Sequence, residues 1–160
     1  MRTKKNYVRE IDPDPKHNSV LVAKLINRVM QRGKKSVARK HVYQALEIML
    51  EKSKGKKTAD ELMEELVEKI SPKMEVRSRR VGGASYQVPM PVKPRRAVSL
   101  ALRWLVIEAN KRPNKNHHTF SEKLVAEMQD ALKDQGGAIE RRNHAHRMAE
   151  ANKAFAHFRW

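Results

Sequence analysis

The chain has 160 residues, and its 35 lysines and arginines against 18 aspartates and glutamates give a formal net charge of +17. Such an excess repels itself unless a polyanion neutralises it, and nucleic acid is the commonest such partner. The absence of cysteine excludes disulfides and thiolate metal sites, and it is compatible with a reducing cytoplasm.

A membrane partner is the alternative that the charge leaves open, and the sequence does not favour it. No apolar run approaches the roughly 18 residues that cross a bilayer. The amino terminus, MRTKKNYVRE, lacks the apolar centre of a secretory signal. Binding to an anionic membrane surface would call for a basic amphipathic anchor or a lipidation site, and neither is evident. We therefore expect no membrane partner.

The length suits one domain, residues 1–160, which can bury about two thirds of its unfolded surface. Residues 1–18 combine scattered cations with Pro13 and Pro15 and have little apolar content. They are expected to form an extended basic tail that can lie along phosphates.

The first helix is predicted to begin near Ser19, where apolar residues start to recur at helical spacing. Asn18 or Ser19 can cap its start, and Gly33 is expected to end it. The members of its apolar stripe are Val22, Leu25, Ile26, Val29 and Met30.

Lys34 and Lys35 fill the following turn, and Ser36 is expected to cap a second helix that ends at Gly55. Its apolar stripe consists of Val42, Ala45, Leu46, Met49 and Leu50. The cations near its start are unfavourable for the helix dipole, which suggests an external anion, although a solvated turn explains them as well.

Thr58 and Glu61 form a capping box that opens a third helix, the only markedly acidic one. This helix is expected to face away from a polyanion. Ser71 and Pro72 close it.

Residues 74–91 read as two short strands joined at Gly82 and Gly83, which tolerate the positive φ of a tight hairpin turn. The expected partners are Val81 with Ala84, Arg79 with Tyr86, and Arg77 with Val88 on one face, and Arg80 with Ser85, Ser78 with Gln87, and Val76 with Pro89 on the other. Neither face is a clean apolar stripe, and burying either would take guanidinium groups out of water. We therefore expect a ribbon that projects from a helical body as a nucleic-acid arm; a solvated surface hairpin is the alternative.

Pro94 suits a first helical turn, and residues 97–109 are apolar nearly all round, so this helix is expected to be the spine of the core. Trp104 is interpreted as a core anchor rather than a base-stacking platform. After a polar linker at residues 111–118, Thr119 and Glu122 form a second capping box. The inward residues of that helix are Phe120, Leu124, Val125, Met128 and Leu132.

Gly136 and Gly137 break the helical pattern, and the last segment, residues 139–155, alternates cations with alanines. Its apolar face is thin, so the segment is expected either to pack loosely or to serve as an interaction surface.

No catalytic constellation and no metal site is predicted. His144 and His146 lie two residues apart, on opposite sides of a helix, and are interpreted as ordinary surface or RNA-facing histidines. Nucleotide-binding loops are absent, and the acids cluster on the third helix rather than in a pocket. No cofactor is expected.

Several strings together are similar to one family, the bacterial form of ribosomal small-subunit protein seven. They are PDPK (13–16), NS (18–19), LVAK (21–24), GKKS (33–36), MEVRSRRVGGASYQVP (74–89), ALRWL (101–105) and HRMAEANKAFAHFRW (146–160). The resemblance implies a mainly α fold: a six-helix bundle with a protruding two-stranded antiparallel β-ribbon between the third and fourth helices. It also implies a cytoplasmic, non-enzymatic constituent of the small ribosomal subunit.

The resemblance further implies primary binding to the 3′ major domain of the small-subunit ribosomal RNA, which nucleates assembly of the head. The other implied partners are the exit-site tRNA, mRNA near its exit path, and neighbouring head and platform proteins. In some bacteria the family also represses translation of its own operon.

Transferred onto this chain, the ribosomal RNA candidates are Arg2, Lys4, Lys5, Lys34, Lys35, Arg77, Arg79, Arg80, Arg95 and Arg96. The tRNA-side candidates are Val81, Gly82, Gly83, Ala84, Tyr86, Arg141, Arg142, His144 and Arg147. No role is transferred to the linker at residues 109–121.

Two other classes of protein remain as alternatives. A DNA architectural protein with a β-arm usually carries a wedge residue such as proline near the tip, whereas this tip is Gly82-Gly83. An RNA-modifying enzyme would need the catalytic residues that the chain lacks.

Overall fold

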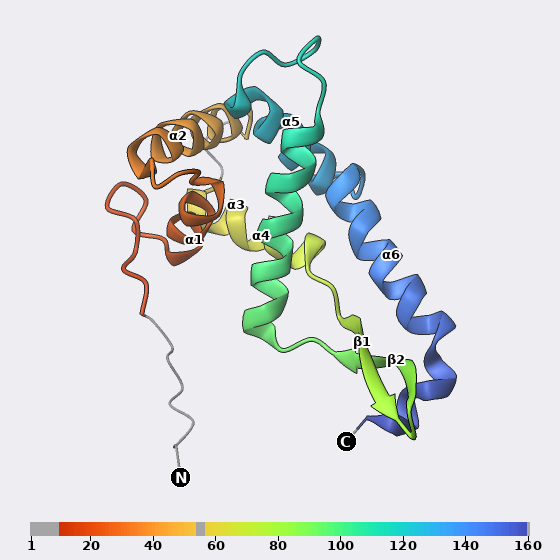
Figure 1. The fold of residues 1–160 in the computed structure, drawn as a ribbon. Coiled ribbons are helices and arrows are strands. Elements are labelled where there is room, and N and C mark those ends of the chain that lie inside the picture. The colour runs from red at the N-terminus through yellow and green to blue at the C-terminus, as the bar shows by residue number, and fades with distance from the viewer. Residues whose placement is uncertain (1–9, 54–56, 160) are drawn as a thin grey trace.

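The structure is a computed structural model that describes residues 10–53 and 57–159 (Figure 1). Its elements are α1 (Val20–Val29), α2 (Lys35–Lys52), α3 (Ala59–Ile70), β1 (Met74–Val81), β2 (Ala84–Pro91), α4 (Pro94–Lys111), α5 (Phe120–Leu132), α6 (Gly137–Ala151) and the 3₁₀-helix η1 (Lys153–Phe158). The predicted mainly α architecture, with six α-helices and a ribbon between α3 and α4, is confirmed.

Helix α4 is the spine of the bundle, as its composition predicts. It contacts α1, α3, α5 and α6, and Figure 1 shows it running through the middle of the molecule. Leu105 is 1% exposed, and Trp104 packs against the same core while staying half-buried. No helix among the described residues has both the length and the apolarity to cross a bilayer.

Side-chain caps start three of the helices where the sequence predicts them. The Ser19 hydroxyl accepts a hydrogen bond from the Val22 amide at 3.3 Å and begins α1. Both capping boxes form, one at the start of α3 and one at the start of α5. Each satisfies amide groups that would otherwise have no acceptor in the first helical turn.

Two predicted boundaries around the first turn are wrong. Helix α1 ends at Val29 because Met30 leaves the helical region, with ψ at 129°, and Gly33 lies farther on in the turn with φ at +74°. Helix α2 begins at Lys35, one residue before the predicted cap Ser36, and its N-cap residue makes no side-chain hydrogen bond. At the other end α2 stops at Lys52, and Gly55 lies outside the described residues.

The last segment is also divided differently from the prediction. Helix α6 begins at Gly137 and not at residue 139, with Gly136 as its N-cap residue at φ +90°. It ends at Ala151, where the backbone amide and the side-chain amide of Asn152 both donate to the Met148 carbonyl, at 3.2 and 2.8 Å. The chain then continues as η1.

The ribbon has the predicted register, from Val81 opposite Ala84 at the tip to Met74 opposite Pro91 at the base. The ribbon is more covered than the sequence predicts, although Arg77 and Arg80 stay exposed. Val88 is fully buried, and the Tyr86 ring lies 5.3 Å from that of Phe155 and 5.2 Å from that of Phe158. The cover is possible because these apolar side chains come from β2, whereas the arginines come from β1.

Residues 10–18 form no helix or strand but lie against α2. The Asp14 carboxylate is 3% exposed and accepts hydrogen bonds from the Tyr43 hydroxyl at 2.8 and 2.9 Å. It also accepts from the backbone amides of Lys16 and His17. A buried acid therefore anchors this stretch to the bundle before α1 begins.

Candidate nucleic-acid interface

A basic cleft of about 400 Å³ opens between α1 and α4. Lys24 and Arg28 line it from α1, Arg95 lines it from the first turn of α4, and Ile11 of the tail lies at its side. No acid is among the described residues that line it. The sequence pointed to Arg95 but missed Lys24 and Arg28, because only the packing of α1 on α4 brings the three cations together.

The turn between α1 and α2 carries a second group of cations. Lys34 and Lys35 are both exposed, and neither is paired with an acid in the described part of the chain. Lys34 lines a hollow of about 410 Å³ together with Arg32 and His41. Helix α2 has no acid in its first turn to offset the positive end of its dipole, so the turn is suited to an external anion.

At the ribbon stem, Arg77 and Arg96 share one acid. Glu75 accepts from the Arg77 Nε at 2.7 Å through Oε1 and from the Arg96 Nε at 2.6 Å through Oε2. Burial by itself would raise the pKa of the Glu75 carboxyl, but the bonds from the two arginines outweigh burial and lower that pKa. Beyond this group Arg80 is exposed and Arg79 is half-buried.

The ribbon tip is built of small residues. Gly82 and Gly83 have φ values of +56° and +90°, which glycine adopts without strain. Gly82, Gly83 and Ala84 are exposed, and Val81 is half-buried. Tyr86 differs from the tip proper because its ring packs on the phenylalanines of η1.

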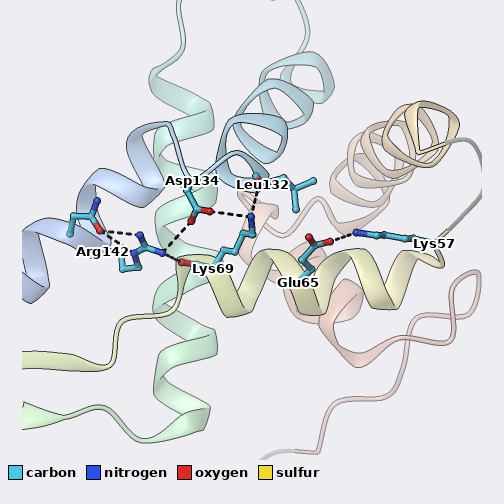
Figure 2. Close-up of polar contacts among 7 residues, drawn as sticks. Lys57, Glu65, Lys69, Leu132, Asp134 and Arg142 are labelled. Atoms are coloured by element: carbon cyan, nitrogen blue, oxygen red, sulfur yellow. Dashed lines mark hydrogen bonds and ion pairs between the residues drawn. The ribbon is translucent and has the colours of Figure 1, made fainter.

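Two of the four predicted tRNA-side residues on α6 are engaged within the protein. The Arg141 guanidinium pairs with Glu108. Burial alone would raise the pKa of the Glu108 carboxyl, but hydrogen bonds from Lys111 and Arg141 lower it. Arg142 donates to the Lys69 carbonyl at 2.5 Å. Lys69 and Arg142 both approach Asp134, as Figure 2 shows. Arg142 therefore joins α6 to the carboxyl end of α3.

The other two α6 candidates, His144 and Arg147, are exposed. They lie along a shallow hollow that Trp104 and Arg141 also line. Of the α6 set, His144 and Arg147 are thus the more open to an external partner. The remaining candidates, Arg2, Lys4 and Lys5, lie outside the described residues.

His146 has a structural position that the sequence did not indicate. Its Nε2 accepts a hydrogen bond from the Lys73 amide at 2.9 Å, which ties α6 to the residue before β1. Burial, with Arg142 and Lys73 nearby, lowers the pKa of this imidazole and favours the neutral form that can accept. Among the described residues no three His, Asp or Glu side chains cluster in a way that could hold a metal ion.

Comparison with known proteins supplies the family. A family model for ribosomal protein S7p/S5e matches residues 1–153. The chain is 56% identical to "Small ribosomal subunit protein uS7" of Dictyoglomus thermophilum over 95% of its own length and 94% of the relative. It is 51% identical to the protein of that name from Stenotrophomonas maltophilia over the same shares. The protein of that name from Sulfurimonas denitrificans is 50% identical over the full length of both chains. The chain therefore belongs to the ribosomal protein S7p/S5e family and is a structural, non-enzymatic component of the ribosome.

Proposed function

We propose that this ribosomal protein works in the small subunit, in the cytoplasm, as a primary binder of ribosomal RNA that nucleates assembly of the head around the 3′ major domain. The observation that carries the proposal is the presence of exposed cations at three separate places on the fold. They lie in the α1–α4 cleft, at the α1–α2 turn and on the ribbon stem. Separated clusters suit an RNA junction, where phosphates of several strands approach from different directions.

The ribbon favours RNA over the architectural binding of DNA. A DNA-bending arm inserts an apolar wedge near its tip, but this tip is two glycines, and Pro89 and Pro91 lie at the base of the ribbon. A stem with forked guanidinium groups can bind phosphates bidentately without opening a base step.

The exposed tip and the open face of α6 are proposed as the tRNA side. Small residues at Gly82, Gly83 and Ala84 let the backbone approach a ligand closely, and His144 and Arg147 offer donors. By the family resemblance, the proposal extends to mRNA near its exit path, to neighbouring head and platform proteins, and to repression of the protein's own operon.

The primary test measures binding of the full chain to a transcript of the 3′ major domain between 50 and 200 mM salt. Each phosphate that the protein neutralises releases counterions, so about six to ten contacts would weaken binding by a thousandfold or more across this range. An unrelated RNA hairpin of equal length is the control. A flat salt response, or equal affinity for the hairpin, contradicts the proposal.

A second test separates the stem from the tip. Arg77→Ala with Arg79→Ala is expected to weaken RNA binding and subunit assembly, whereas deletion of residues 82–84 is expected to spare assembly and alter exit-site tRNA occupancy. Chemical footprinting of reconstituted subunits reads out both effects. The division between stem and tip is wrong if the deletion blocks incorporation and the double arginine variant assembles normally.

A further inference from the structure

We propose that Glu75 is a positioning residue that holds Arg77 and Arg96 as a paired site for an RNA phosphate. The inference rests on the proposed function and adds a role for an acid inside a basic surface. Glu75 and Arg96 lie 21 residues apart, on β1 and at the start of α4, so only the fold brings them together.

Each guanidinium group keeps hydrogen-bond donors that Glu75 does not occupy. Glu75 occupies the Nε–Nη2 edge of Arg77, with distances of 2.7 and 2.6 Å to Oε1. It meets Arg96 through Nε, at 2.6 Å to Oε2. Each arginine therefore keeps the Nη edge that points away from the carboxylate, and that edge can form two parallel hydrogen bonds to a phosphate.

The exposed fractions of the three side chains place the acid inside and the two cations outside. The Glu75 side chain is 12% exposed, whereas those of Arg77 and Arg96 are 51% and 50% exposed. An incoming phosphate therefore reaches the arginines first. The two guanidinium groups contact the same carboxylate and would repel each other without it. The carboxylate offsets that repulsion, and the three groups together keep a net positive charge.

Positioning has a measurable benefit because a free arginine loses rotamer freedom when it binds. Ordering a long side chain at an interface opposes binding by about 0.5–1.5 kcal/mol, roughly a two- to twelvefold change in affinity. Glu75 orders both side chains before RNA arrives. The opposite view, that Glu75 merely competes with phosphate for the arginines, predicts the opposite sign when the acid is removed.

The central variant is Glu75→Gln in the full chain, measured against the 3′ major domain transcript. The amide oxygen can accept from one arginine only, and its amino group faces the other. We expect binding about three- to tenfold weaker than wild type. The slope of affinity against salt should stay unchanged because both cations remain, whereas Arg77→Ala should reduce that slope by about one.

Glu150→Gln is the matched control. Glu150 is exposed and lines the groove at the ribbon base with Lys73 and Pro89, and it pairs with no described cation. This variant makes the same change in net charge and should bind RNA as tightly as wild type, or slightly more tightly. Arg96→Lys tests the same site with Glu75 left in place, so the inference does not depend on the folding of Glu75→Gln alone. It keeps the positive charge but loses the forked guanidinium group, so it should also weaken binding without changing the slope of affinity against salt.

The outcomes separate this inference from the proposed function. Weaker binding by Glu75→Gln and Arg96→Lys, at unchanged slope and with Glu150→Gln unaffected, supports the positioning role. If Glu75→Gln binds as tightly as wild type or more tightly, or if Glu150→Gln weakens binding equally, the positioning role is overturned while specific RNA binding stands. If wild type itself does not prefer the transcript over the hairpin, the proposed function fails first.

Discussion

Replacing Arg112 by alanine should destabilise the protein far more than removing a surface cation does. Arg112 caps the end of α4 and donates to Glu127 on α5 through Nε at 2.9 Å and Nη2 at 2.7 Å. The other oxygen of Glu127 accepts from the Ala138 amide at 2.9 Å, in the first turn of α6. One carboxylate thus joins three helices.

The magnitude follows from the burial of that carboxylate. Glu127 is 2% exposed and Arg112 is 20% exposed, so Arg112→Ala would leave a charge in the core with a single amide donor. Breaking such a pair costs about 3–5 kcal/mol in free energy of unfolding. Burial opposes protonation of Arg112, but the hydrogen bonds that it donates to Asp130 and Glu127 outweigh burial and raise the pKa of the guanidinium, so Arg112 stays charged.

Urea unfolding followed by circular dichroism measures the difference in free energy of unfolding between Arg112→Ala and wild type. Lys57→Ala is the control, because the Lys57–Glu65 pair in Figure 2 has side chains that are 46% and 36% exposed, and such pairs contribute about 1 kcal/mol or less. Adding Glu127→Gln to Arg112→Ala should recover part of the loss, since the amide oxygen can still accept from Ala138. A loss for Arg112→Ala no larger than that for Lys57→Ala would refute the reasoning.

Three further predictions concern the core, the ribbon base and the ribbon cover. Leu105→Ala should lower the free energy of unfolding by about 2–5 kcal/mol in urea, and Trp104→Ala should cost less than a fully buried tryptophan because its side chain is half-exposed. The lowered pKa of His146 means that the unfolded chain binds a proton more readily, so stability should fall as the pH drops from about 6.5 towards the folded pKa. A falling protection factor of the Lys73 amide in hydrogen exchange, corrected for the intrinsic rate at each pH, would report it, and His146→Phe should remove this pH dependence of the protection factor. Phe155→Ala should make the ribbon more open to limited proteolysis while the helical signal stays intact, and unchanged cleavage would show that η1 does not hold the ribbon.

The sequence by itself determined the local structure. Apolar patterns located the first five helices, and the capping boxes at Thr58 and Thr119 placed two helix starts to the residue. The glycine pair at the ribbon tip set the pairing of every residue from 74 to 91. These features depend on neighbours within a few positions along the chain, so composition and spacing are sufficient to predict them.

The glycines at the start of α6 have a role that the neighbouring sequence alone does not predict. The sequence indicated a break at Gly136-Gly137, but the reason for glycine lies elsewhere in the fold. A Cβ at Gly137 would come within 2.8 Å of the Glu108 carboxylate on α4, and a Cβ at Gly136 would lie 3.2 Å from Glu127. A side chain at Gly137 would therefore force Glu108 to shift, and one at Gly136 would also be strained by the φ of +90° at that position.

Tertiary structure alone decided what each charged side chain does. Arginines look alike in a sequence, yet Arg142 binds the end of α3, 73 residues away, Arg112 neutralises a buried acid, and Lys24 and Arg28 face an open cleft with Arg95. The covered face of the ribbon has the same origin, because Phe155 and Phe158 are distant from Tyr86 in the sequence and only the fold places their rings beside it. Whether a cation is available to RNA depends on acids and carbonyls that the fold brings within hydrogen-bonding distance, and spacing along the chain contains no record of those distances.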